Sequence, residues 1–571
     1  MKLTIFRSAW LAMLAVWLVS PSWAESELLT WDELVTLYQQ DTPPAPLAQK
    51  LHALLTTPFV SNAASDAGKQ PRKPASPELG PFLRVVQWNI ERGLEFDAVR
   101  LAFSDPNKFI ALTEDKGSKI NEHEVARVRE QISILKDADV IVLNEVDWGL
   151  NRTRFRNVAK ELADALDMNY AWGVEFVEVD PLTMGIDQHL VIQEVEDTYK
   201  DQAGEKQEIL NYIHDIMKPD PERYKGLHGS AILSRYPLSN VRLVPFRFQG
   251  HDWYADEKKR RGPLAKGEGK ASMEVFKEQF IRQVRRGGRM MLIADITDPM
   301  IPSGSATVVA THLEDETQPK NRRRQMEELL EQVRDIRHPV IVVGDMNTSD
   351  QDGAPITVGR LFKQHFGSAK WWASEGVSEA VSYTTPFGLF YQATVGTTGF
   401  ARKLEDPTER SLPIIADNPE AKFFDLVEHF RFADGTAFDF RGDRRRTANG
   451  RGGRLADSNE RALKGFEPTE ELGRHYGPVG KYKLDWIFVK PGGLQEPDQH
   501  HGPLRFAPHF ARTIQTLNHA IPERISDHNP IVVDLPLGEP GHEAEAVTTE
   551  KTLGAAVSES GSGAATATAD R

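Results

Sequence analysis

Short apolar runs rich in β-branched residues, such as "VIVLNEV" and "ATVVATH", alternate with helix-like patterns through much of the chain. Such runs are typical of buried strands. Between them, apolar residues recur at about 3.6-residue spacing, which predicts amphipathic helices. Two such stripes are Val125, Val128, Ile132 and Leu135, and Met326, Leu329, Leu330, Val333 and Ile336. The alternation predicts an α/β (α+β) protein in which helices cover sheets.

Polar side chains stand at the ends of these strand-like runs. Four runs finish in them: at Asn89, at Glu145, at His312, and at the pair Asp345 and Asn347. Two later runs begin with them: at Asp485, and at the pair Asp527 and His528. If the two later strands run antiparallel to the others, all six groups gather at one edge of the sheets. The pattern therefore predicts one site built from distant segments.

The start of the chain has the pattern of an export signal. Lys2 and Arg7 precede an apolar stretch from Ala9 to Val19, and "SPSWA" follows. This order predicts a signal peptide cleaved after Ala24, and hence a periplasmic or extracellular protein. The apolar stretch is shorter than the ~18 residues that a membrane span needs, and no later stretch is long enough. We therefore expect no transmembrane segment after signal removal.

Changes in composition along the rest of the chain predict where its regions begin and end. Trp31, Leu34, Val35 and Tyr38 recur at helical spacing, and a linker rich in Ser, Ala, Pro and Lys leads into the body. The C-terminal tail is rich in Glu, Ala, Thr and Ser and has little to bury. The predicted regions are a signal peptide at 1–24, a helical appendage and linker at 25–80, a folded body at 81–536 and a disordered tail at 537–571.

The absence of cysteine and the charge limit the chemistry. With no cysteine, disulfides, thiolate catalysis and a Cys-type zinc site are excluded. The formal net charge is −14, whereas nucleic-acid-binding domains are usually basic, so charge alone does not indicate nucleic-acid binding. Oxygen and imidazole groups remain as metal ligands.

Four carboxylates meet in the predicted site: Glu145, Asp345, Asp485 and Asp527. Carboxylates in one cleft repel each other, and a divalent cation relieves that repulsion. Oxygen ligands favour Mg²⁺ or Mn²⁺ over zinc, and Mg²⁺ leaves positions for substrate phosphate. The two histidines are then available for proton transfer or for donating to a phosphate. Singly, each residue could be a turn former or a loop histidine, and only their conjunction favours a site.

Seven motifs carry a family resemblance. In chain order they are "QWNIERG", "LNEVD", "GSAILSRYPL", "THLE", "VVGDMN", "KLDWIFV" and "SDHNPI". They resemble the endonuclease/exonuclease/phosphatase superfamily, which has the deoxyribonuclease I-like fold, over residues 82–535 with long gaps. The resemblance implies a four-layer α/β/β/α sandwich of two mainly antiparallel sheets with its site at one edge. The long inserts and the N-terminal helical appendage would be additions to that fold.

The resemblance also implies a cation site and the residues that act on the water. Glu145 resembles the main metal-binding glutamate of the family, with Asn89 and Asp527 in the metal set or close to it. Asp345 resembles the aspartate that orients or deprotonates the attacking water. Asn347 resembles its phosphate-contacting partner.

Three further residues match positions that serve the phosphate in the family. His528 resembles the histidine that contacts the scissile phosphate or transfers a proton. Asp485 matches the carboxylate that fixes the tautomer of that histidine. His312 aligns with a second histidine, present in the deoxyribonuclease and sphingomyelinase branches, that assists the leaving group.

Some positions set this chain apart. Ser230 stands where many relatives have Asn, which puts a substrate contact there in doubt. Arg152 and Arg154 follow Glu145 closely and are candidates for phosphate contact. Large inserts occur at 178–224, 248–289 and 350–428, and loops of this length in a compact domain are usually functional or disordered.

The resemblance and the residues together predict an exported, Mg²⁺- or Mn²⁺-dependent phosphoesterase. The substrate would be a phosphodiester, with nucleic acid favoured because His312 follows the deoxyribonuclease pattern. A sphingomyelinase-like or small-molecule phosphodiesterase or phosphatase is the alternative. A non-catalytic binding protein on the same fold is disfavoured because every expected catalytic position is filled. No protein partner can be inferred from the sequence.

Overall fold

The computed structural model describes residues 27–186, 188–200, 203–260, 283–348, 420–441, 446–448, 454–455, 460–461, 468–471, 481–499 and 501–540. The predicted signal peptide, the tail beyond residue 540 and most of the insert at 350–428 lie outside these residues. None of the described helices is long and apolar enough to cross a membrane.

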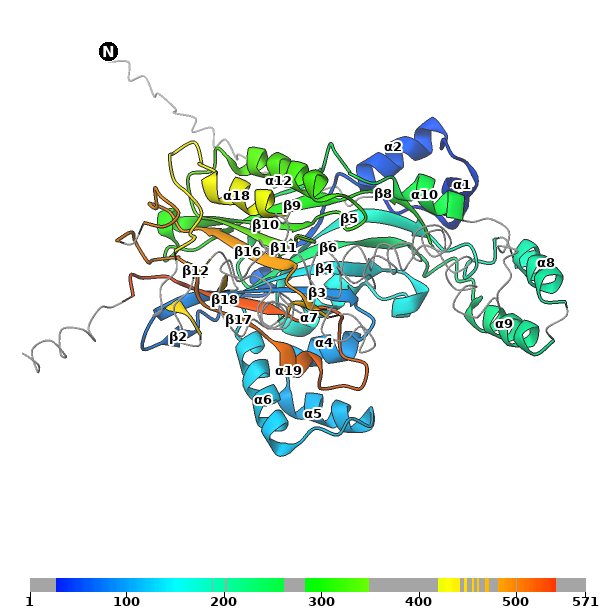
Figure 1. The fold of residues 1–571 in the computed structure, drawn as a ribbon, viewed down its shortest axis with the longest axis horizontal. Coiled ribbons are helices and arrows are strands. Elements are labelled where there is room, and N and C mark those ends of the chain that lie inside the picture. Colours follow the sequence, from blue (N-terminus) through cyan, green and yellow to red (C-terminus); the bar gives the residue numbers. More distant parts are fainter. Residues whose placement is uncertain are drawn as a thin grey trace, which may run out of the picture.

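The larger sheet has nine strands and carries most of the motifs (Figure 1). Its main path is β1 (Phe59–Ser61), β5 (Asn169–Val179), β6 (Leu227–Ser234), β4 (Val140–Trp148), β3 (Gly80–Arg92), β18 (Ile531–Pro536) and β17 (His509–Thr513). β2 (Ala75–Ser76) pairs with β3, and β8 (Val284–Gly287) pairs with β5. The chain thus returns near its C-terminal end to place β18 beside β3.

The smaller sheet has five strands. In order they are β16 (Asp485–Lys490), β11 (Val340–Asp345), β10 (Ser305–His312), β9 (Met290–Thr297) and β7 (Leu238–Pro245). β3 pairs with β4, and β10 with β11, in parallel, whereas the other pairings in the two large sheets are antiparallel. Two short pairs also occur: β12 (Arg454–Leu455) with β13 (Glu460–Arg461), and β14 (Glu470–Glu471) with β15 (Lys481–Tyr482). The predicted mixed α/β class with two mainly antiparallel sheets is confirmed.

The core is divided by the pleat of the strands, because successive side chains point to opposite faces. In β3, Val85 belongs to a cluster that joins the two sheets, and Val86 belongs to a cluster that includes the helices on the other face. Those helices are α4 (Phe96–Ala102), α5 (Pro106–Asp115), α6 (Glu122–Lys136) and α7 (Val158–Leu166). The outer face of the smaller sheet packs on α12 (Pro319–Val333) and α18 (Ala421–His429). This arrangement, visible in Figure 1, is consistent with the expected layers.

The N-terminal segment is joined closely to the body. It forms α1 (Trp31–Gln39), α2 (Ala45–Leu54) and α3 (Ala63–Asp66), and β1 extends the larger sheet. Leu34 and Leu54 are fully buried in the same cluster as β3 and β4. Within the stretch predicted as a linker, the backbone N–H groups of Arg72 and Lys73 donate to the Asp139 carboxylate. The segment therefore helps to build the main core.

The inserts contribute further helices. The insert at 178–224 forms a helical pair, α8 (Gln188–Thr198) and α9 (Ala203–Ile216), which projects from the body in Figure 1. The insert at 248–289 contributes α10 (Trp253–Arg260) and β8, both beside α1. Arg286 of β8 donates to the backbone carbonyls of Leu37 and Gln40 at the C-terminal end of α1. Short elements complete the fold: η1 (Asn151–Thr153), η2 (Pro302–Gly304) and α19 (Gln515–Asn518).

Candidate active site

Irregular pairing of the central strands aims the polar side chains toward one edge of the sheets. Register shifts occur between Asn89 and Arg92 in β3, between Leu143 and Val146 in β4, and between Val174 and Phe176 in β5. Glu145 lies within one of these irregular stretches, with a φ of 53°. A bulge re-aims the side chains of its strand, and a positive φ is uncommon for a residue other than glycine. The local backbone therefore presents Glu145 in a direction that a regular strand would not.

Asn89 connects the two sheets at this edge. Its Nδ2 lies 3.2 Å from Glu145 Oε1 on β4 and 3.3 Å from Asp345 Oδ2 at the end of β11. Its Oδ1 accepts a hydrogen bond from the backbone N–H of Glu91 over 3.2 Å. Asn89, Glu145 and Asp345, which are predicted site residues from three segments, thus share one cluster. β16 and β18 run antiparallel to their neighbours, as the predicted convergence requires.

A buried hydrogen-bonded frame supports the cluster from between the sheets. Asn144 Oδ1 accepts from the backbone N–H of Asp345 over 2.9 Å, and Asn144 Nδ2 donates to Ser230 Oγ over 2.9 Å. Ser230 donates onward to Glu175 Oε1 over 2.6 Å and has no solvent exposure. Gln87 Nε2 donates to Asp485 Oδ1 over 2.7 Å. Ser230 is a candidate for substrate contact in the sequence; in the structure its buried hydroxyl joins Asn144 to Glu175 within this frame.

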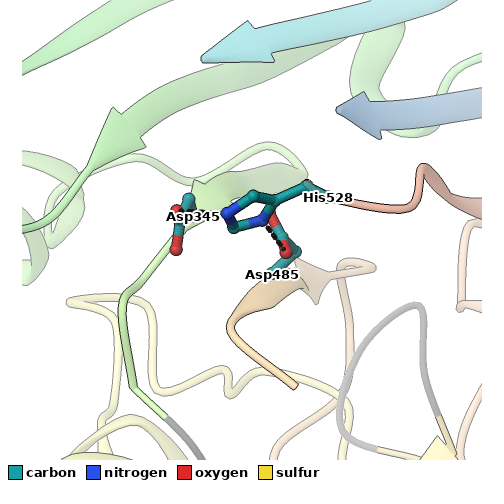
Figure 2. Close-up of side chains that lie close together, drawn as sticks. All are labelled: Asp345, Asp485 and His528. Atoms are coloured by element: carbon teal, nitrogen blue, oxygen red, sulfur yellow. Dashed lines mark hydrogen bonds and ion pairs between the residues drawn. The ribbon is translucent and has the colours of Figure 1, made fainter. Parts of the chain in front are cut away.

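Asp345, Asp485 and His528 form the centre of the site (Figure 2). His528 Nδ1 lies 2.8 Å from Asp485 Oδ2, and His528 Nε2 lies 3.6 Å from Asp345 Oδ2. Burial disfavours the charged imidazole, but Asp485 and Asp345 outweigh burial and hold the pKa of His528 well above its ordinary value. Burial and then the charge of Asp485 raise the pKa of Asp345 to about 7.

The segment that carries His528 is held in place before β18 begins. The backbone N–H of His528 donates to Ser526 Oγ over 3.1 Å, and its carbonyl accepts from Trp88 Nε1 over 2.8 Å. Ser526 Oγ also donates to the Asn89 carbonyl over 2.6 Å. The irregular "SDHNP" stretch is thereby fixed against β3, which places Asp527 and His528 on the same side of the sheet as Asn89.

His312 approaches the same carboxylate from the end of β10. Its Nε2 lies 3.5 Å from Asp345 Oδ2 and 3.1 Å from Asn347 Nδ2. Its Nδ1 lies 2.8 Å from Nη1 of Arg289, which also donates to Glu175 over 2.9 Å. Burial and then the neighbouring cation of Arg289 hold the pKa of His312 well below its ordinary value. His312 is therefore a neutral imidazole at physiological pH.

Carboxylates gather at the side of the site where a cation is expected. The backbone N–H of Asp527 donates to Glu91 Oε2 over 3.2 Å. Burial, followed by the charges of Asp527 and Glu145, raises the pKa of Glu91 to about 7. This mutual repulsion, in a set of oxygen donors, is the situation that a divalent cation relieves. The donor set of Glu145, Asn89 and Asp527, with Glu91 beside it, therefore fits Mg²⁺ or Mn²⁺.

Among the residues that the structure describes, two groups of side chains have ligand atoms close enough together to hold a metal ion. One consists of Asp345, Asp485 and His528, and the other of Glu470, Asp527 and His528. A protonated His528 that donates to Asp485 is a poor ligand, because only the neutral ring offers a lone pair. The oxygen donors near Glu145 therefore suit a divalent cation better than a group that includes His528.

The two candidate arginines differ in their surroundings. Arg152 is bound by Asp147 through Nε and Nη2 over 2.7 and 2.8 Å, and by Glu178 through Nη2 over 2.8 Å. Asp147 Oδ1 also accepts from Nδ1 of His228 over 2.9 Å. Arg154 is exposed at the end of η1. Arg152 is thus neutralised by two carboxylates, whereas Arg154 faces solvent.

Sequence reasoning missed several residues of the site. Glu91 lies in "QWNIERG", two positions after Asn89, so its place in a recognised motif was an available signal. Asn144 likewise lies in a recognised motif, "LNEVD", directly before Glu145. Arg289 and Glu175 lie within or beside strands, and Glu470 lies in β14, next to residues outside the described part of the chain. For these last three, nothing in the linear pattern indicates which site residue they contact.

The fold and this cluster agree with a family match. The chain belongs to the endonuclease/exonuclease/phosphatase family, whose sequence model matches residues 86–528. The family comprises hydrolytic nucleases and phosphatases that depend on divalent metals, so the metal-type cluster at this edge is the expected one. A search of the curated proteins gave no match.

Solved structures of the same family resemble the chain at a distance. An endonuclease/exonuclease/phosphatase from Beutenbergia cavernae is 15% identical, with a TM-score of 0.33, and the match covers 80% of this chain and 72% of that one. The 3'-5' exonuclease NExo from Neisseria meningitidis is 12% identical, with a TM-score of 0.33 and coverage of 79% and 99%. The human Nocturnin catalytic domain is 12% identical, with a TM-score of 0.28 and coverage of 80% and 93%. These similarities are too remote to transfer an activity.

Proposed function

We propose that the protein is an exported, Mg²⁺- or Mn²⁺-dependent phosphodiesterase that hydrolyses its substrate by in-line attack of water, with nucleic acid as the favoured substrate. The observation that carries this proposal is the sharing of Asn89 Nδ2 between Glu145 and Asp345, with both histidines within 3.6 Å of the same Asp345 oxygen. The cluster joins an oxygen-rich cation side to a side with two imidazoles. That combination suits a phosphoryl group held between a metal and hydrogen-bond donors.

The cation would be held by Glu145, Asn89 and Asp527. When bound, it would neutralise charge on the phosphoryl oxygens. Glu91 would either complete the set or accept a proton, because its pKa of about 7 makes both forms accessible near neutral pH. The low pKa of Glu145, which the charge of Arg92 maintains against burial, keeps its carboxylate available as a ligand.

Asp345 would orient the attacking water and take its proton as the oxygen bonds to phosphorus. Its Oδ1 accepts from the backbone N–H of Asn347 over 2.8 Å, which fixes the carboxylate plane and leaves Oδ2 toward the site. A base with a pKa of about 7 is well matched to neutral pH. Its two histidine neighbours favour the ionised form of Oδ2 when they donate to it.

The two histidines would act on the phosphate and the leaving oxygen. Asp485 holds the Nδ1 proton of His528, so His528 Nε2–H points into the site and would donate to a non-bridging phosphoryl oxygen. His312, as a neutral imidazole, would donate a hydrogen bond from Nε2 to the leaving oxygen and so stabilise the charge that develops there when the P–O bond breaks. The leaving oxygen would take its proton from solvent, and Asp345 would return to solvent the proton that it gained from the attacking water, so the protons balance.

The acidity of the chain favours one alternative. A net charge of −14 opposes long-range attraction of duplex nucleic acid, so a sphingomyelinase-like or small-molecule phosphodiesterase or phosphatase is the second candidate. Supporting the nucleic-acid proposal is the exposed Arg154 near the site, since arginine is a preferred partner of phosphate.

A side-by-side assay tests the proposal. Purified protein is incubated with plasmid DNA, RNA, bis-p-nitrophenyl phosphate and sphingomyelin, each with Mg²⁺, with Mn²⁺ and with EDTA. We expect metal-dependent cleavage of the diesters, and DNA cleavage that weakens steeply with added salt. A preference for sphingomyelin over DNA and RNA would favour the second candidate, a sphingomyelinase-like phosphodiesterase. No hydrolysis of any ester would contradict the proposed function, and activity in EDTA would contradict the proposed dependence on a metal.

Export is tested separately by fractionation and by sequencing the mature N-terminus, which we expect at Glu25.

A further inference from the structure

A cavity opens between the turn that follows β3 and the loop that follows β4. Its volume is about 230 Å³. The charged residues that line it are Lys116, Arg152, Arg154, Arg156, Glu95 and Asp97. The four cations outnumber the two carboxylates in a protein whose overall charge is −14. A cationic cavity in an acidic protein concentrates anions locally.

Most of the lining charges are already neutralised. Lys116 pairs with Glu95 at 2.8 Å, and Arg156 pairs with Glu161 at 2.6 Å while stacking on Phe96. Arg152 is held by Asp147 and Glu178. Within the described part of the chain, the exposed Arg154 guanidinium has no such carboxylate partner. Arg154 is therefore the lining cation that is available to an anion from outside.

The backbone fixes Arg154 at the rim of the cavity. Arg154 and the following Phe155 both have positive φ, 56° and 62°, which bulky residues seldom adopt. Hydrogen bonds hold this conformation: Phe155 N–H donates to Leu150 O over 2.9 Å, and Gly149 N–H donates to Arg156 O over 2.9 Å. A rigid, strained loop at a rim is typical of a functional position. The arginine is thus presented on a fixed support.

Both walls of the cavity are joined to the site through short stretches of chain. One wall begins at Gly93, four residues after Asn89, which limits the separation of their Cα atoms to about 14 Å. Gly93 N–H donates to Ile90 O over 2.9 Å, so the chain turns immediately after β3 and the true separation is shorter. On the other wall, Arg152 bonds to Asp147, two residues after Glu145. Neighbouring phosphates of one nucleic-acid strand are spaced within this range.

We infer that this cavity binds a second phosphate group of the substrate, adjacent to the phosphodiester that is hydrolysed, and that Arg154 is its main contact. The inference rests on the proposed function and narrows it to substrates with at least two neighbouring phosphates, such as oligonucleotides. The volume suits a phosphate with part of its sugar, because sites for whole drug-sized ligands are larger, at roughly 300–1,000 Å³.

A pair of substrates isolates the second phosphate. A thymidine dinucleotide has one phosphodiester, and the trinucleotide has two. We expect Arg154→Ala to lower kcat/KM for the trinucleotide by about tenfold, as for the loss of one charge-assisted hydrogen bond, and to lower it much less for the dinucleotide. The control is Lys160→Ala, which removes one positive charge from exposed α7, where Lys160 pairs with Asp164. Equal losses on both substrates, or the same effect from Lys160→Ala, would overturn the inference.

A binding measurement separates this inference from the proposed function. Inorganic phosphate and pyrophosphate are titrated into the His528→Ala protein in EDTA, with or without Arg154→Ala, and binding is followed by calorimetry. We expect binding that Arg154→Ala removes and Lys160→Ala does not. Such binding, together with a wild-type protein that hydrolyses no diester, would support the cavity while contradicting the activity. Absent binding, or binding that Arg154→Ala leaves unchanged, would contradict the cavity whatever the activity.

Discussion

Nη1 of Arg289 donates a hydrogen bond to Nδ1 of His312 over 2.8 Å. A guanidinium has no acceptor, so Nδ1 of His312 must be unprotonated and the ring proton must lie on Nε2. That nitrogen lies 3.5 Å from Asp345 Oδ2, the acceptor beside it, and 3.1 Å from the amide nitrogen of Asn347, which itself donates to the Leu313 carbonyl. Arg289 thus fixes His312 as a neutral donor into the site, whereas Asp485 accepts from Nδ1 of His528 and favours the doubly protonated form of that ring.

Replacing Arg289 should release this constraint. In Arg289→Lys, which retains a charge inside the buried cluster, we expect kcat to fall by about 10- to 100-fold, in line with other groups that orient a catalytic residue. The pKa of His312 should rise in Arg289→Gln, because burial remains but the neighbouring cation is lost. Nitrogen NMR of labelled histidine reads the tautomer and the titration directly. A His312 that keeps its proton on Nε2 in both variants would contradict the assignment.

His528→Ala should remove turnover without removing the cation. We expect a loss of at least about 10²-fold in kcat, the usual scale for a group that transfers or donates a proton. Mn²⁺ affinity, measured by calorimetry, should stay within a few-fold because we place His528 on the phosphate. Asp485→Asn is the matched variant, since it keeps the volume but loses the charge that orients the ring. Near-full hydrolysis by His528→Ala would rule out its role.

Glu145→Gln should weaken cation binding, which His528→Ala should leave nearly unchanged. Loss of the carboxylate weakens the cation site, so we expect the Mg²⁺ concentration for half-maximal activity to rise by at least about tenfold, with partial recovery at high Mg²⁺. EDTA should abolish the activity of the wild-type protein, and Mg²⁺ or Mn²⁺ should restore it. An unchanged Mg²⁺ requirement in Glu145→Gln would remove this residue from the cation site.

The metal-free protein should lose stability as pH rises. Asp345 and Glu91 both have a folded pKa of about 7, above the value near 4 expected in the unfolded chain. Between these values the folded state binds more protons, so the free energy of unfolding falls as pH rises from about 4 to 7. If other titrating groups contribute equally at both pH values, calorimetry of the wild-type protein in EDTA should show a Tm several degrees lower at pH 8 than at pH 5. In Asp345→Asn the difference between the two Tm values should be smaller. Identical pH profiles for the two proteins would contradict the burial of Asp345 as a charged group.

The strands and the residues at their ends were largely predictable from the sequence. The β-branched runs around Val86, Val142 and Val342 are buried on both faces, and their apolar pattern is continuous. The residue types at the ends of these runs matched one kind of chemistry, which indicated the site. The polar groups meet at one edge only if β16 and β18 run antiparallel to their neighbours. Their antiparallel pairing with β11 and β3 meets that requirement.

What the sequence did not predict depends on contacts between distant segments. Phe59–Ser61 is only three residues long, so its pairing with β5 leaves no periodic signal. Arg289 ends a long insert, and its role follows from meeting Glu175 and His312, which lie 114 and 23 positions away. The burial of Ser230 likewise follows from its neighbours across two strands. Such relationships arise only when the sheets are assembled.

The position of β18 has a consequence for synthesis. Its residues pair with β3, and the Arg84 guanidinium binds Asp534 across 450 positions of chain. A nascent chain that still lacks β18 has neither His528 nor this partner of β3, so the cluster around Asp345 cannot assemble before this strand has been made.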